Sequence, residues 1–155
     1  MSEQGEAWRS NLITDSAAIQ QLALQAKRVA VLGIKTEDKA SQPAFFVPAY
    51  LQSAGVEVVP VPVFYPDVTH ILGQQVYRKV ADVPGEIDIV DVFRKPSDIP
   101  QHLHDIITAA PKAVWLQSGI RHPEAEEQLA RAGIKVVSDR CLKVEHQQAA
   151  LHSKM

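Results

Sequence analysis

Hydrophobic residues form two kinds of run along the chain, and these alternate from residue 28 onward. Short runs rich in β-branched residues predict buried strands at residues 28–33, 56–61, 87–93, 113–116 and 134–138. Their nearly continuous apolar character is typical of strands covered on both faces, as in a parallel sheet. The pattern therefore predicts a sheet that lies between two layers of helices.

The segments between these runs carry apolar residues at helical spacing. After Pro43, the stripe that includes Phe46, Tyr50 and Leu51 predicts a helix ending near Gly55. Similar stripes predict helices over 99–110 and 123–133, and another after Asp15 or Ser16, ahead of the first strand. Residues 73–84 show a weaker pattern, compatible with a short helix or a loop, and we expect the last few residues to be frayed.

Strands that alternate with helices predict an α/β fold, with right-handed crossovers joining five parallel strands. We expect the spatial order 3-2-1-4-5, preceded by an N-terminal helix. A length of 155 residues suits one compact domain. We assign residues 15–150 to this domain and residues 1–14 to a flexible N-terminal segment.

Composition and charge indicate which partners and which cellular compartment to expect. A formal net charge of −2 gives no overall attraction to nucleic acid or to an anionic membrane. Cys141 is the only cysteine, so no intramolecular disulfide can form, which is typical of a reducing compartment. The start of the chain does not resemble a secretory signal, and no apolar run approaches the roughly 20 residues of a membrane span. We expect a cytoplasmic protein.

The expected ligand site lies beyond the carboxyl ends of the parallel strands. Gly33 ends the first strand and allows a close approach of backbone to ligand, while Lys35 and Lys39 bring positive charge to the following loop. The helix that begins near Pro43 directs its free amides toward the same crevice, where they attract phosphate. Only one glycine of a dinucleotide-binding fingerprint is present, so the alternative remains that Gly33 merely turns the chain while both lysines are solvated.

Several blocks of sequence resemble the small stand-alone CoA-binding proteins, whose domain is related to the nucleotide-binding domain of the succinyl-CoA synthetase α subunit. The resemblance runs from about Val29 to His146. It rests on 29–33, Pro43, Tyr50-Leu51, Gly55, Pro60-Val61, Gly73, Val76-Tyr77, and above all 88–94, 113–120 and 139–146.

The resemblance implies a three-layer Rossmann-like fold with coenzyme A as its cofactor. It places Gly33, Ile34 and Lys35 at the diphosphate, Pro60 and Val61 beside the adenine, Val92, Phe93 and Arg94 along the nucleotide crevice, and Gln117, Ser118 and Gly119 near the pantetheine arm. Two features depart from the family. Lys35 replaces the usual small hydroxyl residue, and Pro62 follows Val61 where the family commonly has asparagine.

Individual residues keep alternative interpretations. Arg94 can hold a phosphate or pair with Asp91 or another nearby carboxylate. Phe64 and Tyr65 can stack on adenine or pack as core or lid residues, and Cys141 near His146 can be a reactive or an inert thiol. No set of His, Asp, Glu or Cys has convincing zinc spacing, and no nucleophile, base and orienting group can be named together.

These observations favour a CoA-binding protein, acting as a sensor, a carrier or a subunit, over an enzyme. An NAD(P)-dependent oxidoreductase is the first alternative, although the second strand ends in Pro60-Val61-Pro62 without the acidic residue that such enzymes use. A ligand-free interaction protein is the second alternative. We expect Gly33→Asp to weaken ligand binding while the surrounding sheet survives.

Overall fold

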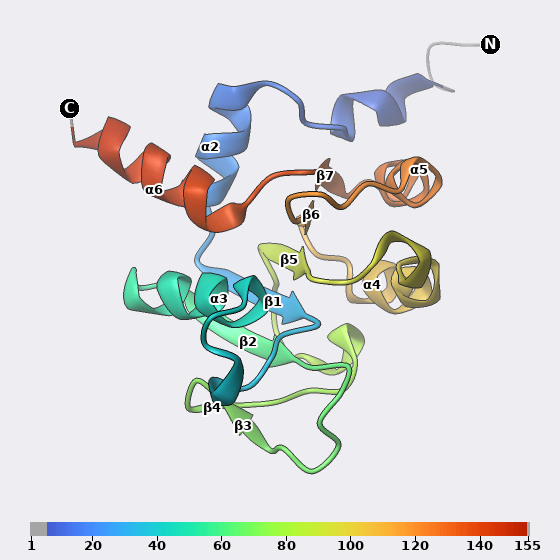
Figure 1. Cartoon of the computed structure of the whole chain (residues 1–155). Helices are drawn as coiled ribbons and strands as arrows, with labels where there is room; N and C mark the ends of the chain where they lie inside the picture. Colours follow the sequence, from blue (N-terminus) through green and yellow to red (C-terminus); the bar gives the residue numbers. More distant parts are fainter. Residues whose placement is uncertain (1–5, 155) are drawn as a thin grey trace.

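A computed structural model describes residues 6–154, and a parallel sheet forms its centre (Figure 1). The sheet contains β1 (Arg28–Leu32), β2 (Glu57–Val61), β5 (Ile89–Val92), β6 (Ala113–Leu116) and β7 (Lys135–Val137). All its strands pair in parallel, and nearly every residue in them is buried. The five predicted strands and the α/β fold class are therefore confirmed.

The order of the strands across the sheet is β2-β1-β5-β6-β7. In terms of the five predicted strands, the third lies beside the first, so its expected place beside the second was wrong. If the segment ending at Tyr77 is counted as an additional strand outside β2, because the Tyr77 amide donates to the Pro60 carbonyl at 3.0 Å, the order becomes 3-2-1-4-5-6, whose first five members follow the expected pattern. That segment lies at the outer side of β2, which leaves β5 to pair with β1.

Helices cover both faces of the sheet. One face packs on α4 (Leu103–Ala109) and α5 (Pro123–Arg131) through a cluster that includes Leu32, Val90 and Leu129. The other face packs on α2 (Ser16–Gln25), α3 (Pro43–Ser53) and α6 (Leu142–Ser153). Alternate residues of each strand enter opposite clusters, because successive side chains of a strand point to opposite faces.

The helices largely match the expected ones. Asp15 caps α2 by accepting a hydrogen bond from the Ala18 amide at 2.9 Å. The helix expected over 99–110 begins instead as two 3-10 turns, Pro96–Asp98 and Pro100–His102, because Pro100 interrupts a regular α-helical start. α6 was not predicted: its apolar residues do not form a regular stripe.

The chain between β2 and β5 contains short elements. β3 (His70–Ile71) and β4 (Gln74–Gln75) form a small hairpin, and a 3-10 turn follows at Val80–Asp82. Ahead of α2, residues Ala7–Asn11 form another 3-10 turn, and the Asn11 side chain donates to the Ala130 carbonyl of α5. Residues 1–5 of the expected flexible segment lie outside the described residues.

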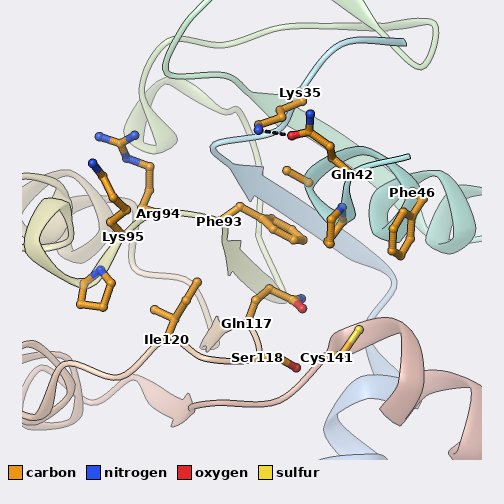
Figure 2. Close-up of a pocket in the computed structure, with 13 residues that line it drawn as sticks. Lys35, Gln42, Phe46, Phe93, Arg94, Lys95, Gln117, Ser118, Ile120 and Cys141 are labelled. Carbon is orange, nitrogen blue, oxygen red and sulfur yellow. Dashed lines mark hydrogen bonds between the residues drawn. The ribbon is translucent and has the colours of Figure 1, made fainter. Parts of the chain in front are cut away.

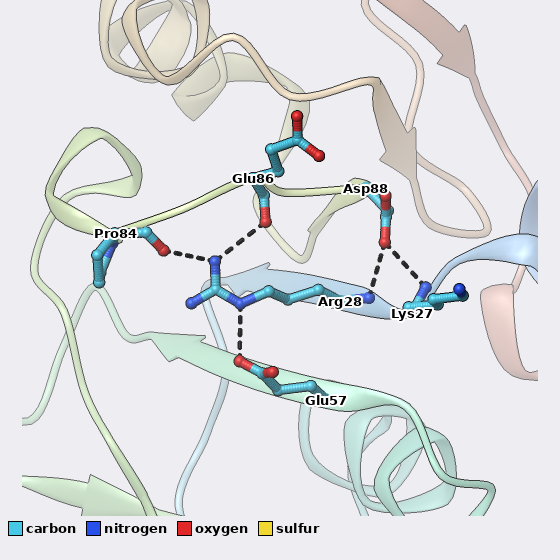
Figure 3. A network of polar contacts seen from close by, with 6 residues as sticks. All are labelled: Lys27, Arg28, Glu57, Pro84, Glu86 and Asp88. Atoms are coloured by element: carbon cyan, nitrogen blue, oxygen red, sulfur yellow. Dashed lines mark hydrogen bonds and ion pairs between the residues drawn. The ribbon is translucent and has the colours of Figure 1, made fainter.

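A polar network ties the strands together at their amino ends (Figure 3). The Arg28 guanidinium donates to the Glu57 carboxylate at 2.7 Å and to the carbonyls of Pro84 and Glu86 at 2.5 and 3.0 Å. Asp88 accepts hydrogen bonds from the backbone amides of Lys27 and Arg28, both at 2.9 Å. The network joins β1, β2 and the chain that leads into β5.

Candidate functional site

A cavity of about 520 Å³ opens at the carboxyl ends of β1, β5 and β6 (Figure 2). Its walls come from the loop after β1, the start of α3, the loops after β5 and β6, and the residue that precedes α6. The lining residues are Lys35, Gln42, Pro43, Ala44, Phe46, Phe93, Arg94, Lys95, Pro96, Gln117, Ser118, Ile120 and Cys141. The cavity thus occupies the crevice in which ligands of open parallel sheets bind.

The beginning of α3 forms one wall of the cavity. Pro43 is its first residue, and Gln42 at the N-cap position makes no side-chain capping bond. The Gln42 side chain instead accepts a hydrogen bond from the Lys35 ammonium group. The helix start therefore combines its dipole with a lysine, an arrangement that attracts anions.

Gly33 determines how closely the loop after β1 approaches β5. Its φ of +88° is left-handed, and a Cβ atom there would lie 2.4 Å from the Phe93 carbonyl oxygen. Any side chain would therefore push apart the ends of β1 and β5. This contact argues against the expectation that the sheet survives Gly33→Asp, so the substitution tests folding as well as ligand contact.

Arg94 borders the cavity but is already engaged by protein groups. Its side chain is 10% exposed and forms an ion pair with Asp98 at 3.4 Å. It also donates from Nε to Nε2 of His102 at 3.1 Å. Burial, and secondly the nearby Arg94 cation, lower the pKa of His102, which keeps the imidazole neutral and able to accept this hydrogen bond. The ion-pair alternative is thus realised with Asp98 rather than Asp91.

Gln117 connects the cavity to a buried carboxyl group. Its Nε2 donates to Oδ1 of Asp91 at 2.6 Å, while Oδ2 of Asp91 has no partner. Asp91 lies in β5 between Val31 and Trp115 and is 0% exposed. Burial raises the pKa of Asp91 to about 8, although the hydrogen bond from Gln117 acts in the opposite direction. The carboxyl group is therefore mainly protonated at neutral pH.

The structure brings six of the predicted site residues together in the cavity wall: Lys35, Pro43, Phe93, Arg94, Gln117 and Ser118. The others lie outside that wall. Ile34, Pro60, Val61 and Val92 are buried, Lys39 pairs with Asp38, and the Gly119 amide donates to Asp139. Gly33 shapes the crevice through its backbone.

The sequence placed the segments 33–46, 93–96 and 117–122 around the crevice, and these contain all the remaining lining residues except Cys141, although none was singled out as a site residue: Gln42, Ala44, Phe46, Lys95, Pro96 and Ile120. Gln42, Ala44 and Phe46 belong to the first turn of α3, whose position in the sequence had pointed to this crevice through its backbone amides. Cys141 reaches the cavity because the Trp115 indole donates to the Arg140 carbonyl at 2.8 Å and holds the preceding residue against β6. Cys141 is partly exposed.

Two further observations concern residues 6–154. No group of three or more His, Cys, Asp or Glu side chains in this part of the chain is placed to hold a metal ion. None of its helices combines the length and apolar character that crossing a bilayer requires.

Comparison with known families and proteins supports a specific relationship. The sequence model of the CoA binding domain matches residues 27–147. A curated relative, the uncharacterized protein YneT of Bacillus subtilis, is 31% identical over 130 residues, which cover 84% of this chain and 93% of that protein.

Solved structures show the same fold over nearly the whole length. The Thermus thermophilus protein called cell-free ID.343 is 41% identical, with a TM-score of 0.79 over 88% of this chain and 99% of that one. A hypothetical protein from Pyrococcus horikoshii is 28% identical, with a TM-score of 0.78 over 88% and 93% of the two chains. The likeness therefore covers most of this chain and nearly all of each of those proteins.

Proposed function

Since this chain belongs to the CoA-binding domain family, we propose that it binds coenzyme A or an acyl-CoA in the cavity at the carboxyl ends of β1, β5 and β6. The observation that carries the proposal is the pairing, in one cavity, of an anion-attracting helix start with an apolar wall. CoA has two matching parts, an anionic diphosphate and an uncharged pantetheine arm that combines methylene and methyl groups with amides.

The start of α3 and Lys35 are suited to the diphosphate. Pro43 has no N–H, and the amides of Phe45 and Phe46 donate to the Gln42 carbonyl. The Ala44 amide, the helix dipole and the Lys35 ammonium group are therefore what favours negative charge here. Lys95 adds a second cation on the opposite side of the cavity, as Figure 2 shows. In this proposal Lys35 and Lys95 contribute charge, while Arg94, paired with Asp98, mainly shapes the wall.

The other part of the cavity suits the pantetheine arm. Phe46, Phe93 and Ile120 offer apolar surface, and Gln117 and Ser118 offer polar groups. Because Gln117 Nε2 is used by Asp91, its Oε1 is the atom placed to accept an amide N–H of the arm. This division of roles describes binding, and we propose a binding role, as sensor, carrier or subunit in the cytoplasm, rather than turnover.

Isothermal titration of the purified full chain with CoA tests this function. We expect saturable heat with one site per chain, and competition between CoA and acetyl-CoA. Absence of heat at millimolar CoA would reject the proposal. Tight binding of NADH instead would support an oxidoreductase. If no nucleotide copurifies with the protein and none binds when added, an interaction protein would be supported.

A pair of serine variants tests the location of the site. Ser118 is exposed at the cavity, whereas Ser153 is exposed at the end of α6. Ser118→Trp fills the cavity and should weaken CoA binding by about tenfold or more, since bulk replaces ligand contacts. Ser153→Trp should bind like the parent protein. Equal affinities of the two variants would place the ligand elsewhere.

A further inference from the structure

One exposed aromatic ring lies just beyond the Arg94 side of the cavity. Phe64 belongs to the loop that follows β2 and is 62% exposed. Among residues 6–154, the other exposed large apolar side chains are aliphatic: Leu24, Val144 and Leu151. A ligand that covers this ring would gain free energy, because burial of its exposed apolar surface is favourable.

Arg94 links this ring to the cavity. The guanidinium carbon of Arg94 lies 5.6 Å from the centre of the Phe64 ring, within the range of a cation–π contact. Arg94 itself lines the cavity. The Phe64 ring therefore continues the cavity wall past Arg94, toward the carboxyl end of β2.

The loop that carries Phe64 is held in a defined shape. The Arg78 guanidinium donates to the carbonyls of Phe64, Tyr65 and Val68, at 3.1, 2.8 and 2.8 Å. Tyr65 adopts a left-handed φ of +62° and places its ring edge-on to Phe64, with ring centres 6.5 Å apart. These contacts fix the backbone on both sides of the ring, so its position relative to Arg94 is set by the chain itself.

We propose that Phe64 is the surface on which the adenine ring of CoA stacks, which rests on the proposed function. A purine offers a flat π face that stacks on an aromatic side chain without needing hydrogen-bond partners. With the adenine on Phe64, the diphosphate reaches the start of α3 and Lys35, and the pantetheine arm continues toward Gln117 and Ser118.

Titration of a Phe64→Ala variant with CoA and with two fragments tests the proposal. ADP contains the adenine but no pantetheine, and phosphopantetheine contains the arm but no adenine. We expect the affinities for CoA and ADP to fall about tenfold, and that for phosphopantetheine to stay unchanged. Phe64→Trp should retain affinity for CoA and ADP, because indole stacks at least as well. Leu151→Ala removes an equally exposed side chain on α6 and is the matched control.

The outcomes separate this inference from the proposed function. If the parent protein binds CoA and Phe64→Ala binds it equally well, the stacking proposal is wrong and the CoA-binding function stands. An equal loss for all three ligands would mean a general change in the cavity and would also overturn stacking. A change in sedimentation with unchanged titrations would assign Phe64 to a protein interface and overturn it. If the parent protein binds neither CoA nor ADP, both proposals fail.

Discussion

At the amino ends of the strands polar groups bond mainly to one another, whereas at the carboxyl ends several face a cavity. Arg28 has Glu57 and two carbonyl oxygens as acceptors, and Asp88 accepts from two amides (Figure 3). On the other side, Lys35, Lys95 and Ser118 line open space. The first arrangement stabilises the sheet, and the second leaves donors and charge for a ligand.

Two aspartates three positions apart show the same contrast. Asp88 stands at the amino edge of the sheet. Burial alone would raise its pKa, but hydrogen bonds from Lys27, Lys112 and Arg28 outweigh this effect, so the pKa of Asp88 is lowered. Asp91 stands in the middle of β5, where burial raises its pKa to about 8 and a single hydrogen bond opposes this. Asp91 is fully buried with one donor, whereas Asp88 is partly exposed with three, and burial together with the number of donors decides the charge of each carboxyl group at neutral pH.

The largest expected effect comes from Gly33→Ala. The added Cβ meets the Phe93 carbonyl at 2.4 Å, which forces β1 and β5 apart at the cavity. We expect the free energy of unfolding to fall by about 4 kcal/mol or more. Urea denaturation measures this change.

Gly133→Ala is the matched control for that substitution. Gly133 has a φ of +86°, close to the +88° of Gly33, but a Cβ there would meet nothing within 4 Å. Its replacement should lower the free energy of unfolding only by the cost of a left-handed alanine, about 1–2 kcal/mol. Equal losses in the two variants would show that β5 moves aside without difficulty.

A smaller effect is expected for Asp91→Asn, which should change how the free energy of unfolding depends on pH. Because the pKa of Asp91 is raised in the folded state, the folded protein keeps a proton that the unfolded chain releases above about pH 4. Its contribution to stability is complete below that pH and is lost as pH rises to about 8. Between pH 5 and 7 this amounts to roughly 3 kcal/mol, which the asparagine variant should not lose.

The difference between parent and variant isolates this contribution. Burial lowers the pKa values of His102 and His146, and these groups make stability rise with pH over part of the same range. Their effect is common to both proteins and cancels. Urea denaturation at pH 5, 6 and 7 supplies the data. Parallel pH profiles for the two proteins would contradict a buried neutral Asp91.

The smallest effects come from removing one charge at each edge. Arg28→Gln should lower the free energy of unfolding by about 2 kcal/mol, because it breaks hydrogen bonds to a carboxylate and two carbonyls, and should leave CoA affinity unchanged. Lys35→Gln should leave stability nearly unchanged and weaken CoA binding by about 1 kcal/mol, less at high salt. Thermal unfolding of both variants measures the change in stability, and titration with CoA measures the change in affinity. A reversed pattern would contradict the division between the edges.

The sequence predicted the sheet and four of its flanking helices, α2 to α5, because long apolar runs and stripes are local signals. The order of the strands was harder to predict, because nothing in residues 87–93 indicates whether they pair with β1 or β2. In the structure β5 pairs with β1, and the Tyr77 amide bonds to Pro60 at the outer side of β2. The hairpin at residues 70–75 escaped prediction because its strands have only two residues each.

The site was predictable in its position but only partly in its residues. Lys35 and Pro43 followed from the loop after the first strand, and Phe93, Arg94, Gln117 and Ser118 from the family resemblance. Val61 and Val92 were misplaced with respect to the cavity wall because alternation along a strand turns their side chains into the core. The position of Cys141 at the cavity could not be predicted, because it involves a hydrogen bond between Trp115 and Arg140, which lie far apart in the sequence.

Arg78 affects ligand affinity through the conformational entropy of the loop that it holds. Fixing the backbone of one residue costs about 1–2 kcal/mol of conformational entropy. By bonding three carbonyls of the loop after β2, Arg78 makes folding, rather than ligand binding, bear that cost for the residues around Phe64. A ligand that stacks there meets a preorganised surface, so more of its interaction energy remains as affinity.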